Sequence, residues 1–203
     1  MNQQAIQLAL DHLVQIDDDV AQALDIVGYP SPRIRTAGFE TFLNTLVSQQ
    51  ISTHAADAIW CRVCNLMPTI NAQSLLSLPK GALRMAGLSE RKVRYAQSLA
   101  SDIVAGKFDP DSLDTMDDAS AIKAISQLHG FGRWSAEIYL MFSLQRPDIL
   151  PADDLIILTA LQKLKRLEAK PTPMVARELV KHWSPWRSAG SLLLWRYHRL
   201  VKD

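Results

Sequence analysis

The chain has 203 residues, of which 48% are apolar and 21% are charged, and its formal net charge is +1. This length is enough for one domain, or for two small helical lobes, with a substantial core. The apolar residues are dispersed in short runs, which argues against a membrane-spanning segment, so we expect no membrane partner. The N-terminus lacks the pattern of an export signal, and we expect an intracellular setting, cytoplasmic and nucleoid-associated if the chain is bacterial.

The charges are distributed unevenly along the chain. Residues 158–203 contain ten Lys or Arg against three acids, a net charge of +7, and residues 58–94 contain six bases against one acid. Acids collect instead around residues 17–19 and 102–118. One face can therefore be basic although the whole chain is nearly neutral, as nucleic-acid binding requires. Taken alone, the charges are explained more simply by ordinary solvated helix faces.

Apolar residues recur at helical spacing along almost the whole chain, starting with Ala5, Leu8 and Ala9, and no alternating pattern predicts a strand. Breaks rich in Gly and Pro separate nine or ten predicted helices. We therefore predict an all-α fold. The breaks lie at Gly28–Pro32, Met67–Pro68, Leu78–Gly81, Gly106–Pro110, Gly130–Gly132, Pro147–Pro151 and Pro171–Pro173.

One predicted helix passes through Ile59 and Trp60, and Ser52 or Thr53 is a suitable N-cap for it. Residues 47–51 are then the preceding turn. The two cysteines of the chain, Cys61 and Cys64, follow on the same helix. Without a second pair they cannot complete a four-ligand metal site, so core or surface thiols are the simpler interpretation.

Two glycines, Gly130 and Gly132, stand between two predicted helices, in the segment from Ile125 to Ala136. They permit a tight turn and allow another backbone to approach closely. The amide groups of this turn and of the following helix start would then face an anion such as a phosphate. An ordinary helical hairpin explains the two glycines equally well.

After the next predicted helix the chain delivers two adjacent acids, Asp153 and Asp154, to the start of another helix in the sequence Pro151-Ala-Asp-Asp-Leu155. We expect Asp153 to be the N-cap of this helix and Asp154 to lie in its first turn.

Together these patterns resemble the helix-hairpin-helix DNA glycosylase superfamily, and in particular its 3-methyladenine DNA glycosylase II branch. The resemblance rests on LxGxGxWSA followed by PADDL, and on blocks at residues 47–52 and 182–188. It implies two helical subdomains with a DNA-binding cleft between them. Within one domain, residues 1–35 would be an N-terminal helical segment, 36–125 a subdomain with wedge loops, and 126–203 the hairpin, the catalytic acid and the C-terminal helices.

By resemblance the catalytic acid is Asp154, and Asp153 is structural. A carboxylate is suitable for this reaction because cleavage of an N-glycosidic bond builds positive charge on the sugar. From the residues alone, both acids could simply cap the helix. Relatives that also cut the DNA strand carry a lysine where this chain has Trp134, which predicts base removal only. Four cysteines would be needed for an iron–sulfur cluster, and none follows Cys64.

The resemblance also assigns the base pocket and the residues that fill the gap in the duplex. Trp134 and Trp195 would line the pocket, where an indole face attracts a cationic alkylated base, and Ile138 stands where relatives have an aromatic residue, with Tyr139 beside it. Gln50 and Leu88 match the gap-filling positions. Turn hydrogen bonding for Gln50 and core packing for Leu88 are the alternatives, and Trp183 and Trp186 are expected to pack.

For DNA binding, the resemblance indicates Gly130, Gly132 and the first residues of the next helix, Arg133 and Ser135. Relatives bind sodium or potassium through hairpin carbonyls, here those of Ser126, Leu128 and Gly130.

We therefore expect a monomeric, monofunctional glycosylase that excises alkylated purines such as 3-methyladenine and 7-methylguanine from double-stranded DNA. A non-catalytic DNA-binding module and a glycosylase for oxidised or mismatched bases are the alternatives.

Overall fold

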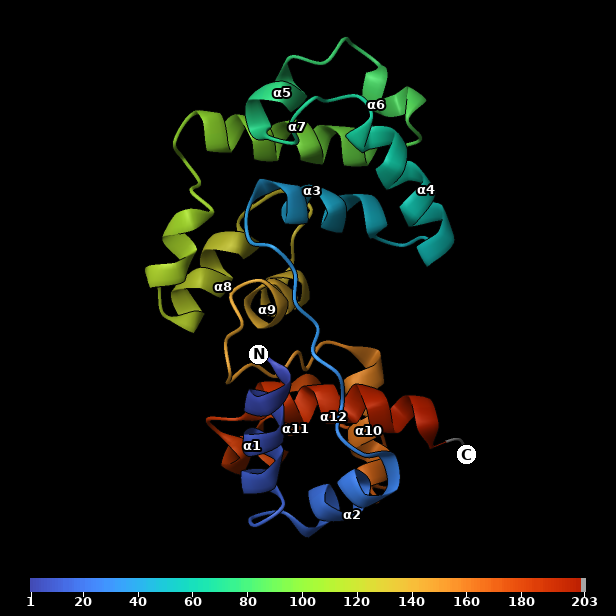
Figure 1. The fold of residues 1–203 in the computed structure, drawn as a ribbon, viewed down its shortest axis with the longest axis vertical. Helices are drawn as coiled ribbons and strands as arrows, with labels where there is room; N and C mark the ends of the chain where they lie inside the picture. The colour runs from blue at the N-terminus through green and yellow to red at the C-terminus, as the bar shows by residue number, and fades with distance from the viewer. Residues whose placement is uncertain (202–203) are drawn as a thin grey trace. The chain divides into compact units, whose positions relative to one another are not determined.

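The computed structural model describes residues 1–201, and in that range it contains only helices and connecting loops (Figure 1). The all-α prediction is confirmed. The described residues form twelve α-helices and two 3-10 helices, more than the nine or ten expected. The excess arises because short helices such as α5 (Ala72–Leu76) and α6 (Ala82–Met85) form between the predicted ones. None of the helices in this range is both long and apolar enough to cross a bilayer.

The chain divides into two compact units, which are described separately. Unit 1 comprises Met1–Ile34 and Glu137–Asp203, and unit 2 comprises Arg35–Ala136. Helix α9 (Arg133–Phe142) begins in unit 2 and ends in unit 1. The N-terminal segment thus shares a unit with the C-terminal helices, although more than one hundred residues separate the two in the chain.

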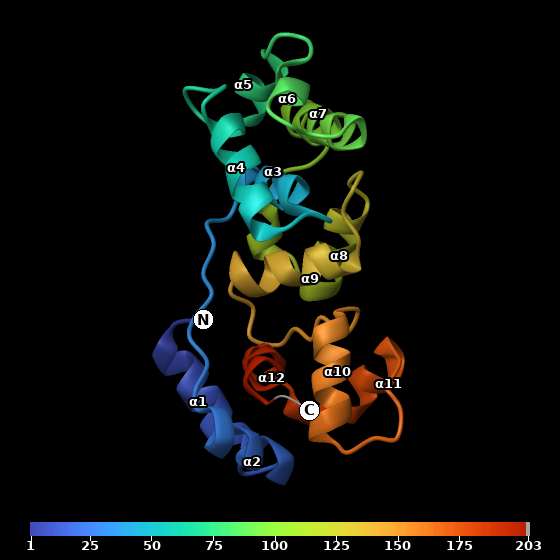
Figure 2. The same ribbon diagram turned by 90° about the vertical axis from the view of Figure 1, so that its right-hand side faces the viewer.

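Helix α12 (Arg187–Leu200) is the centre of unit 1. It contacts α1, α2 and α10 (Figures 1 and 2). Residues 188–195 of α12 are all buried for this reason. Gly190 permits close packing against Trp183, because a Cβ atom there would lie 2.5 Å from the indole ring. The other helices of the unit are α1 (Gln3–Leu13), α2 (Asp18–Val27), α10 (Leu155–Leu164), α11 (Pro173–Leu179) and the 3-10 helix η2 (Lys181–Trp183).

Unit 2 is built around α3 (Phe39–Ser48) and α7 (Glu90–Val104), which contact each other. Phe42 of α3 makes edge-to-face contacts with Phe108 and Phe131, each with ring centroids 5.4 Å apart. Ser52 is the N-cap of α4, and it was one of the two N-cap residues predicted. Because α3 extends to Ser48, the turn between α3 and α4 is shorter than expected. The remaining elements are α4 (Thr53–Cys64), the 3-10 helix η1 (Asp111–Thr115) and α8 (Asp118–Ser126).

Asp17 joins the N-terminal segment to the C-terminal helices of unit 1. Its side chain is 3% exposed and accepts hydrogen bonds from Lys165 Nζ (2.6 and 2.7 Å) and from the indole N–H of Trp183 (2.7 Å). His182 Nε2 lies 2.9 Å from the same carboxylate. Asp17 also caps α2. A buried carboxylate is tolerated only when it is paired and hydrogen-bonded in this way, and Trp183 packs in the core as expected.

The ionisation of Asp17 links this contact to pH. Burial by itself would raise the pKa of Asp17, but the hydrogen bonds from Lys165, Trp183 and His182 outweigh burial and lower the pKa to about 2. Because the folded-state pKa is depressed, the stabilisation is present above the unfolded value near 4 and is lost as the pH falls towards 2.

We predict that Asp17→Asn lowers the free energy of unfolding by about 2 kcal/mol at pH 7, because it weakens the hydrogen bonds to a charged group and leaves Lys165 with Asp19 as its remaining carboxylate partner. The difference from the wild type should shrink as the pH falls from 4 to 2. Urea denaturation at several pH values measures both effects. Asp18→Asn, an exposed acid in the same turn, is the control and should change stability by less than about 0.5 kcal/mol. Equal losses for the two variants would contradict this role of Asp17.

Candidate active site

Asp154 is the N-cap of α10. Its Oδ1 atom accepts hydrogen bonds from the backbone N–H groups of Ile156 (2.8 Å) and Ile157 (3.3 Å). The expectation that Asp153 caps this helix and that Asp154 lies in its first turn was wrong, because the helix begins one residue later, at Leu155. Two main-chain donors therefore fix the Asp154 carboxylate relative to the helix that it begins.

Asp153 has a different partner. Its Oδ2 accepts from Arg177 Nη2 at 2.9 Å, and the same guanidinium lies 3.3 Å from Glu137, which is 2% exposed. Asp153 is 40% exposed. The two neighbouring acids thus differ in their surroundings: Asp153 belongs to an ion pair with α11, and Asp154 is held by main-chain groups.

The loop that leads to Asp154 is fastened to the start of α12 by charged groups. Arg187 donates through Nε (2.6 Å) and Nη2 (2.8 Å) to the two carboxylate oxygens of Asp148, and Ser184 donates to Oδ2 at 2.7 Å. Burial would raise the pKa of Asp148, but the hydrogen bonds from Arg187 and Ser184 outweigh it and lower the pKa. A bidentate pair of this kind fixes orientation as well as distance.

Two serines of α12 complete this attachment. Ser188 accepts from the N–H of Ile149 (3.0 Å) and donates to the carbonyl of Arg146 (2.7 Å), and Ser191 donates to the carbonyl of Ile149 (3.2 Å). These residues were absent from the site predicted from sequence. The block at residues 182–188 signalled Ser184, Arg187 and Ser188, and Ser191 lies outside it.

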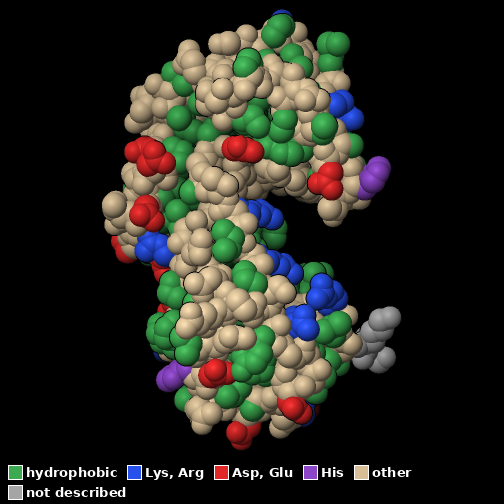
Figure 3. Space-filling model, in the orientation of Figure 1, with side chains coloured by type: hydrophobic (Ala, Val, Ile, Leu, Met, Phe, Trp, Pro, Cys, Tyr) green, Lys and Arg blue, Asp and Glu red, His purple; other side chains and the backbone are tan. Residues whose placement is uncertain are grey.

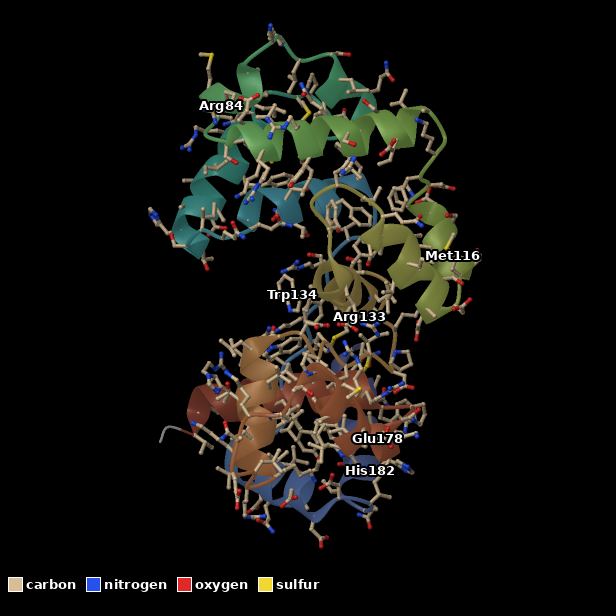
Figure 4. All side chains as sticks on the ribbon, turned by 180° about the vertical axis from the view of Figure 1, so that it is seen from behind. Arg84, Met116, Arg133, Trp134, Glu178 and His182 are labelled. Atoms are coloured by element: carbon tan, nitrogen blue, oxygen red, sulfur yellow. The ribbon has the colours of Figure 1, made fainter. Side chains whose placement is uncertain are left out.

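The predicted pocket residues lie on α9 and α12. Trp134, Ile138 and Phe142 follow one another at intervals of four residues and so share one face of α9, with Trp134 in its first turn (Figure 4). Phe142 packs against Trp195 with ring centroids 5.7 Å apart, a contact that the sequence did not indicate.

The exposure of these side chains differs. Trp134 is 40% exposed, whereas Trp195, Ile138 and Tyr139 are all below 9%. The guanidinium carbon of Arg33 lies 5.3 Å from the centroid of Trp195. The Trp195 ring thus already has a cation next to it. The contact expected between Trp195 and a cationic base is of the same cation–π kind.

The two hairpin glycines of unit 2 have different surroundings. Gly130 has φ +89°, and a Cβ atom there would lie 2.4 Å from Tyr95 and 2.9 Å from Leu46. A Cβ atom at Gly132 would meet nothing within 4 Å. None of the described residues accepts a hydrogen bond from the N–H group of either glycine. Gly130 is therefore required by packing, and Gly132 leaves open space beside the N-terminus of α9.

Of the other predicted DNA contacts, Arg133 is exposed at the start of α9 (Figure 4), and Ser135 is buried. The Leu128 carbonyl accepts from the N–H of Phe131 (3.1 Å), and the Gly130 carbonyl accepts from Gln49 Nε2 (2.8 Å). A carbonyl oxygen has two lone pairs, so these bonds leave each of them able to bind a cation. No cluster of three His, Cys, Asp or Glu side chains suited to a metal exists among residues 1–201.

The loop that contains Gln50 is held by α7. Lys92 Nζ donates to the carbonyls of Val47 and Gln49, each at 2.7 Å, and Arg91 donates to Gln50 Oε1 at 3.0 Å. Burial and the charge of Arg91 lower the pKa of Lys92. Gln50 is exposed and has φ +56°, a strained value for a residue with a side chain.

Gln49 and Lys92, which sequence reasoning missed, connect this loop to the hairpin and to α7. Gln49 does so through its bond to Gly130, and Lys92 through its bonds to the loop carbonyls. Leu88, the second predicted wedge, is 2% exposed in the core of unit 2, so contact with DNA would require it to leave that core.

Comparison with known proteins places the chain in a family. Residues 43–185 match the family model described as HhH-GPD superfamily base excision DNA repair protein. The DNA-3-methyladenine glycosylase 1 of Schizosaccharomyces pombe is 28% identical over 94% of this chain and 86% of its own length. Its structure in complex with abasic DNA superposes with a TM-score of 0.83 over 95% of this chain and 97% of that chain. A DNA-3-methyladenine glycosidase from Bacillus halodurans is 26% identical, with a TM-score of 0.85 over 94% of this chain and 88% of the other.

The family model covers the hairpin glycines and the loop that delivers Asp154, and it ends before the residues of α12 that fasten that loop. This chain is a member of the HhH-GPD superfamily of base excision DNA repair proteins.

Proposed function

We propose that this protein is a monofunctional DNA glycosylase that hydrolyses the N-glycosidic bond of alkylated purines, such as 3-methyladenine and 7-methylguanine, in double-stranded DNA. The observation that carries this proposal is the Asp154 carboxylate, which two main-chain donors fix at the start of α10 in a member of this family. The names of the relatives from S. pombe and B. halodurans support the substrate class. The protein would act inside the cell as a monomer.

The chemistry follows from charge. As the bond between base and sugar breaks, the sugar acquires positive charge, and a carboxylate held close to it stabilises that charge or orients the attacking water. Asp154 is suited to this role because it does not have to reorganise during the reaction: Ile156 and Ile157 hold one oxygen, and the loop before it is fastened to α12. The positive end of α10 also favours the ionised carboxylate.

Alkylation at a ring nitrogen makes the purine cationic and therefore a better leaving group. Such a substrate needs little acid catalysis, which agrees with a single acid in this role. Aromatic rings attract a cationic base more strongly than a neutral one, and Trp134 and Trp195 are the proposed walls of the base site. Trp134 has no nucleophilic atom where strand-cleaving relatives carry a lysine, so the reaction would end at an abasic site.

The hairpin supplies a grip on the backbone. The N–H groups of Gly130 and Gly132 stand ahead of α9, and main-chain donors at a helix N-terminus attract phosphate. Such contacts position the duplex and carry no sequence information. A sodium or potassium ion bound by the carbonyls of Ser126, Leu128 and Gly130 would add positive charge at the same place, and we propose this carbonyl set as its ligands.

We predict that the wild type releases methylated purines from alkylated duplex DNA and that Asp154→Asn reduces the rate at least about a hundredfold. Asparagine caps helices as well as aspartate does, so the melting temperature should hardly change and the loss can be assigned to the charge. Chromatography of the released bases measures the rate. Asp153→Asn is the matched control and should retain most of the activity. A wild type that releases nothing, or equal rates for Asp154→Asn and the wild type, would refute the mechanism.

The two glycines should respond differently to substitution. Gly132→Leu projects a side chain into open space, so we expect unchanged stability but weaker binding to duplexes of any sequence. Gly130→Ala should instead destabilise unit 2 by about 1–3 kcal/mol, because the new Cβ atom collides with Tyr95. Fluorescence anisotropy with two unrelated duplexes and thermal denaturation separate the two effects. Binding of Gly132→Leu at wild-type affinity would count against the hairpin as the grip.

Gln50 is expected to fill the gap that the extruded base leaves. Gln50→Ala should slow base release from duplex DNA by about tenfold. That factor corresponds to about 1.4 kcal/mol of the few kcal/mol that base extrusion costs. Release from single-stranded DNA, where no gap must be filled, should change much less. The same reduction on both substrates would show that Gln50 does not fill the gap.

A further inference from the structure

A pocket of about 170 Å³ in unit 1 lies between residues 30–33 and the last turns of α12. Three arginines, Arg33, Arg196 and Arg199, line it together with Ser31, and no acid among the described residues does so. Figure 3 shows lysine and arginine side chains gathered on the right-hand side of this unit. Apart from Arg33, the residues that line this pocket have no part in the site described above.

Different parts of unit 1 position the arginines of the pocket. Arg196 donates through Nε to the carbonyl of Val27 at 2.5 Å, which uses one of its five donors and directs the guanidinium to one end of α2. Arg33 follows Pro30 and Pro32, whose rings restrict the backbone of that segment. Arg199 is exposed, and no residue in the described range accepts a hydrogen bond from it.

Charge and shape indicate an anion. The negative end of the α12 dipole favours cations at that end of the helix, but it offers only a partial charge to Arg199, whose guanidinium donates no hydrogen bond to a described residue. Guanidinium groups bind phosphate oxygens through two parallel N–H donors, and a serine hydroxyl adds another donor. A phosphate group would therefore satisfy both the charge and the hydrogen-bonding capacity of the pocket.

Arg33 relates the pocket to the reaction, because its guanidinium also lies over the ring of Trp195. We propose that the pocket binds a backbone phosphate of the DNA strand whose damaged base is extruded towards Trp195. The choice of DNA as the ligand rests on the proposed function. The pocket would be a second phosphate site, separate in sequence from the hairpin. Two of its arginines, Arg196 and Arg199, belong to the basic segment at residues 158–203.

The test is the affinity of the wild type, Arg199→Ala and Arg199→Lys for a duplex that contains a stable abasic-site analogue. We expect Arg199→Ala to bind about tenfold more weakly, the value of one charge-assisted bond pair, and its plot of log affinity against log salt to be less steep by about 1. Arg199→Lys keeps the charge but loses the planar guanidinium, so its affinity should lie between those of the wild type and Arg199→Ala. Lys170→Ala, which removes an exposed charge elsewhere in unit 1, is the matched control.

The strand is tested by replacing single phosphates with uncharged methylphosphonates. At one position of the damaged strand, the replacement should weaken DNA binding by the wild type. The same replacement should leave the affinity of Arg199→Ala unchanged, because that variant has already lost the contact. Coupling confined to the complementary strand would overturn the proposed strand. Equal affinity and salt dependence for Arg199→Ala and the wild type would overturn the site itself.

Free nucleotides carry the same phosphate chemistry, so dAMP is titrated in parallel. If Arg199→Ala loses affinity for dAMP but not for DNA, the pocket serves a free nucleotide and the DNA proposal is wrong. Failure of the proposed function is distinguishable from either result: it would appear as a wild type that binds abasic DNA through Arg199 but releases no base from methylated DNA.

Discussion

The catalytic proposal depends on the position of one carboxylate, and that position is fixed by main-chain hydrogen bonds. The N–H groups of Ile156 and Ile157 hold Asp154 where α10 begins. The strong attachment lies upstream, where Asp148 and Ser188 tie the preceding loop to α12. Because these contacts do not involve Asp154 itself, the acid can be replaced by its amide with little effect on the loop that carries it.

Unit 1 also shows how a chain brings distant segments together around one helix. α12 is buried along residues 188–195 because α1, α2 and α10 all contact it. Asp17 secures this cover by pairing with Lys165 and bonding to Trp183. The same N-terminal segment then carries Arg33 to the ring of Trp195. A segment with no catalytic residue of its own is thereby connected to a proposed wall of the base site.

In unit 2, a small number of contacts connect the loop that contains Gln50 to the hairpin that contains Gly130 and Gly132. Gly130 packs against Tyr95 and Leu46, and its carbonyl accepts from Gln49, which adjoins Gln50. Lys92 holds the same loop from α7. The loop proposed to fill the gap in the duplex is therefore anchored to the hairpin proposed to grip its backbone, which explains how Gln50 can be kept in a strained conformation.

The sequence by itself determined the helical class, the positions of the main breaks, the family and the acid pair, because helical spacing, Gly and Pro breaks and short motifs are local properties of the chain. It misplaced the helix cap by one residue, since Asp153 and Asp154 are equally good caps by residue type and the structure places the cap at Asp154. The tertiary structure alone decided that residues 1–34 join the C-terminal helices, that Leu88 is buried, and that Gly130 and Gly132 differ. It also decided that Arg33, Arg196 and Arg199 share a pocket. These features depend on contacts between residues far apart in the chain, and no local pattern records such contacts.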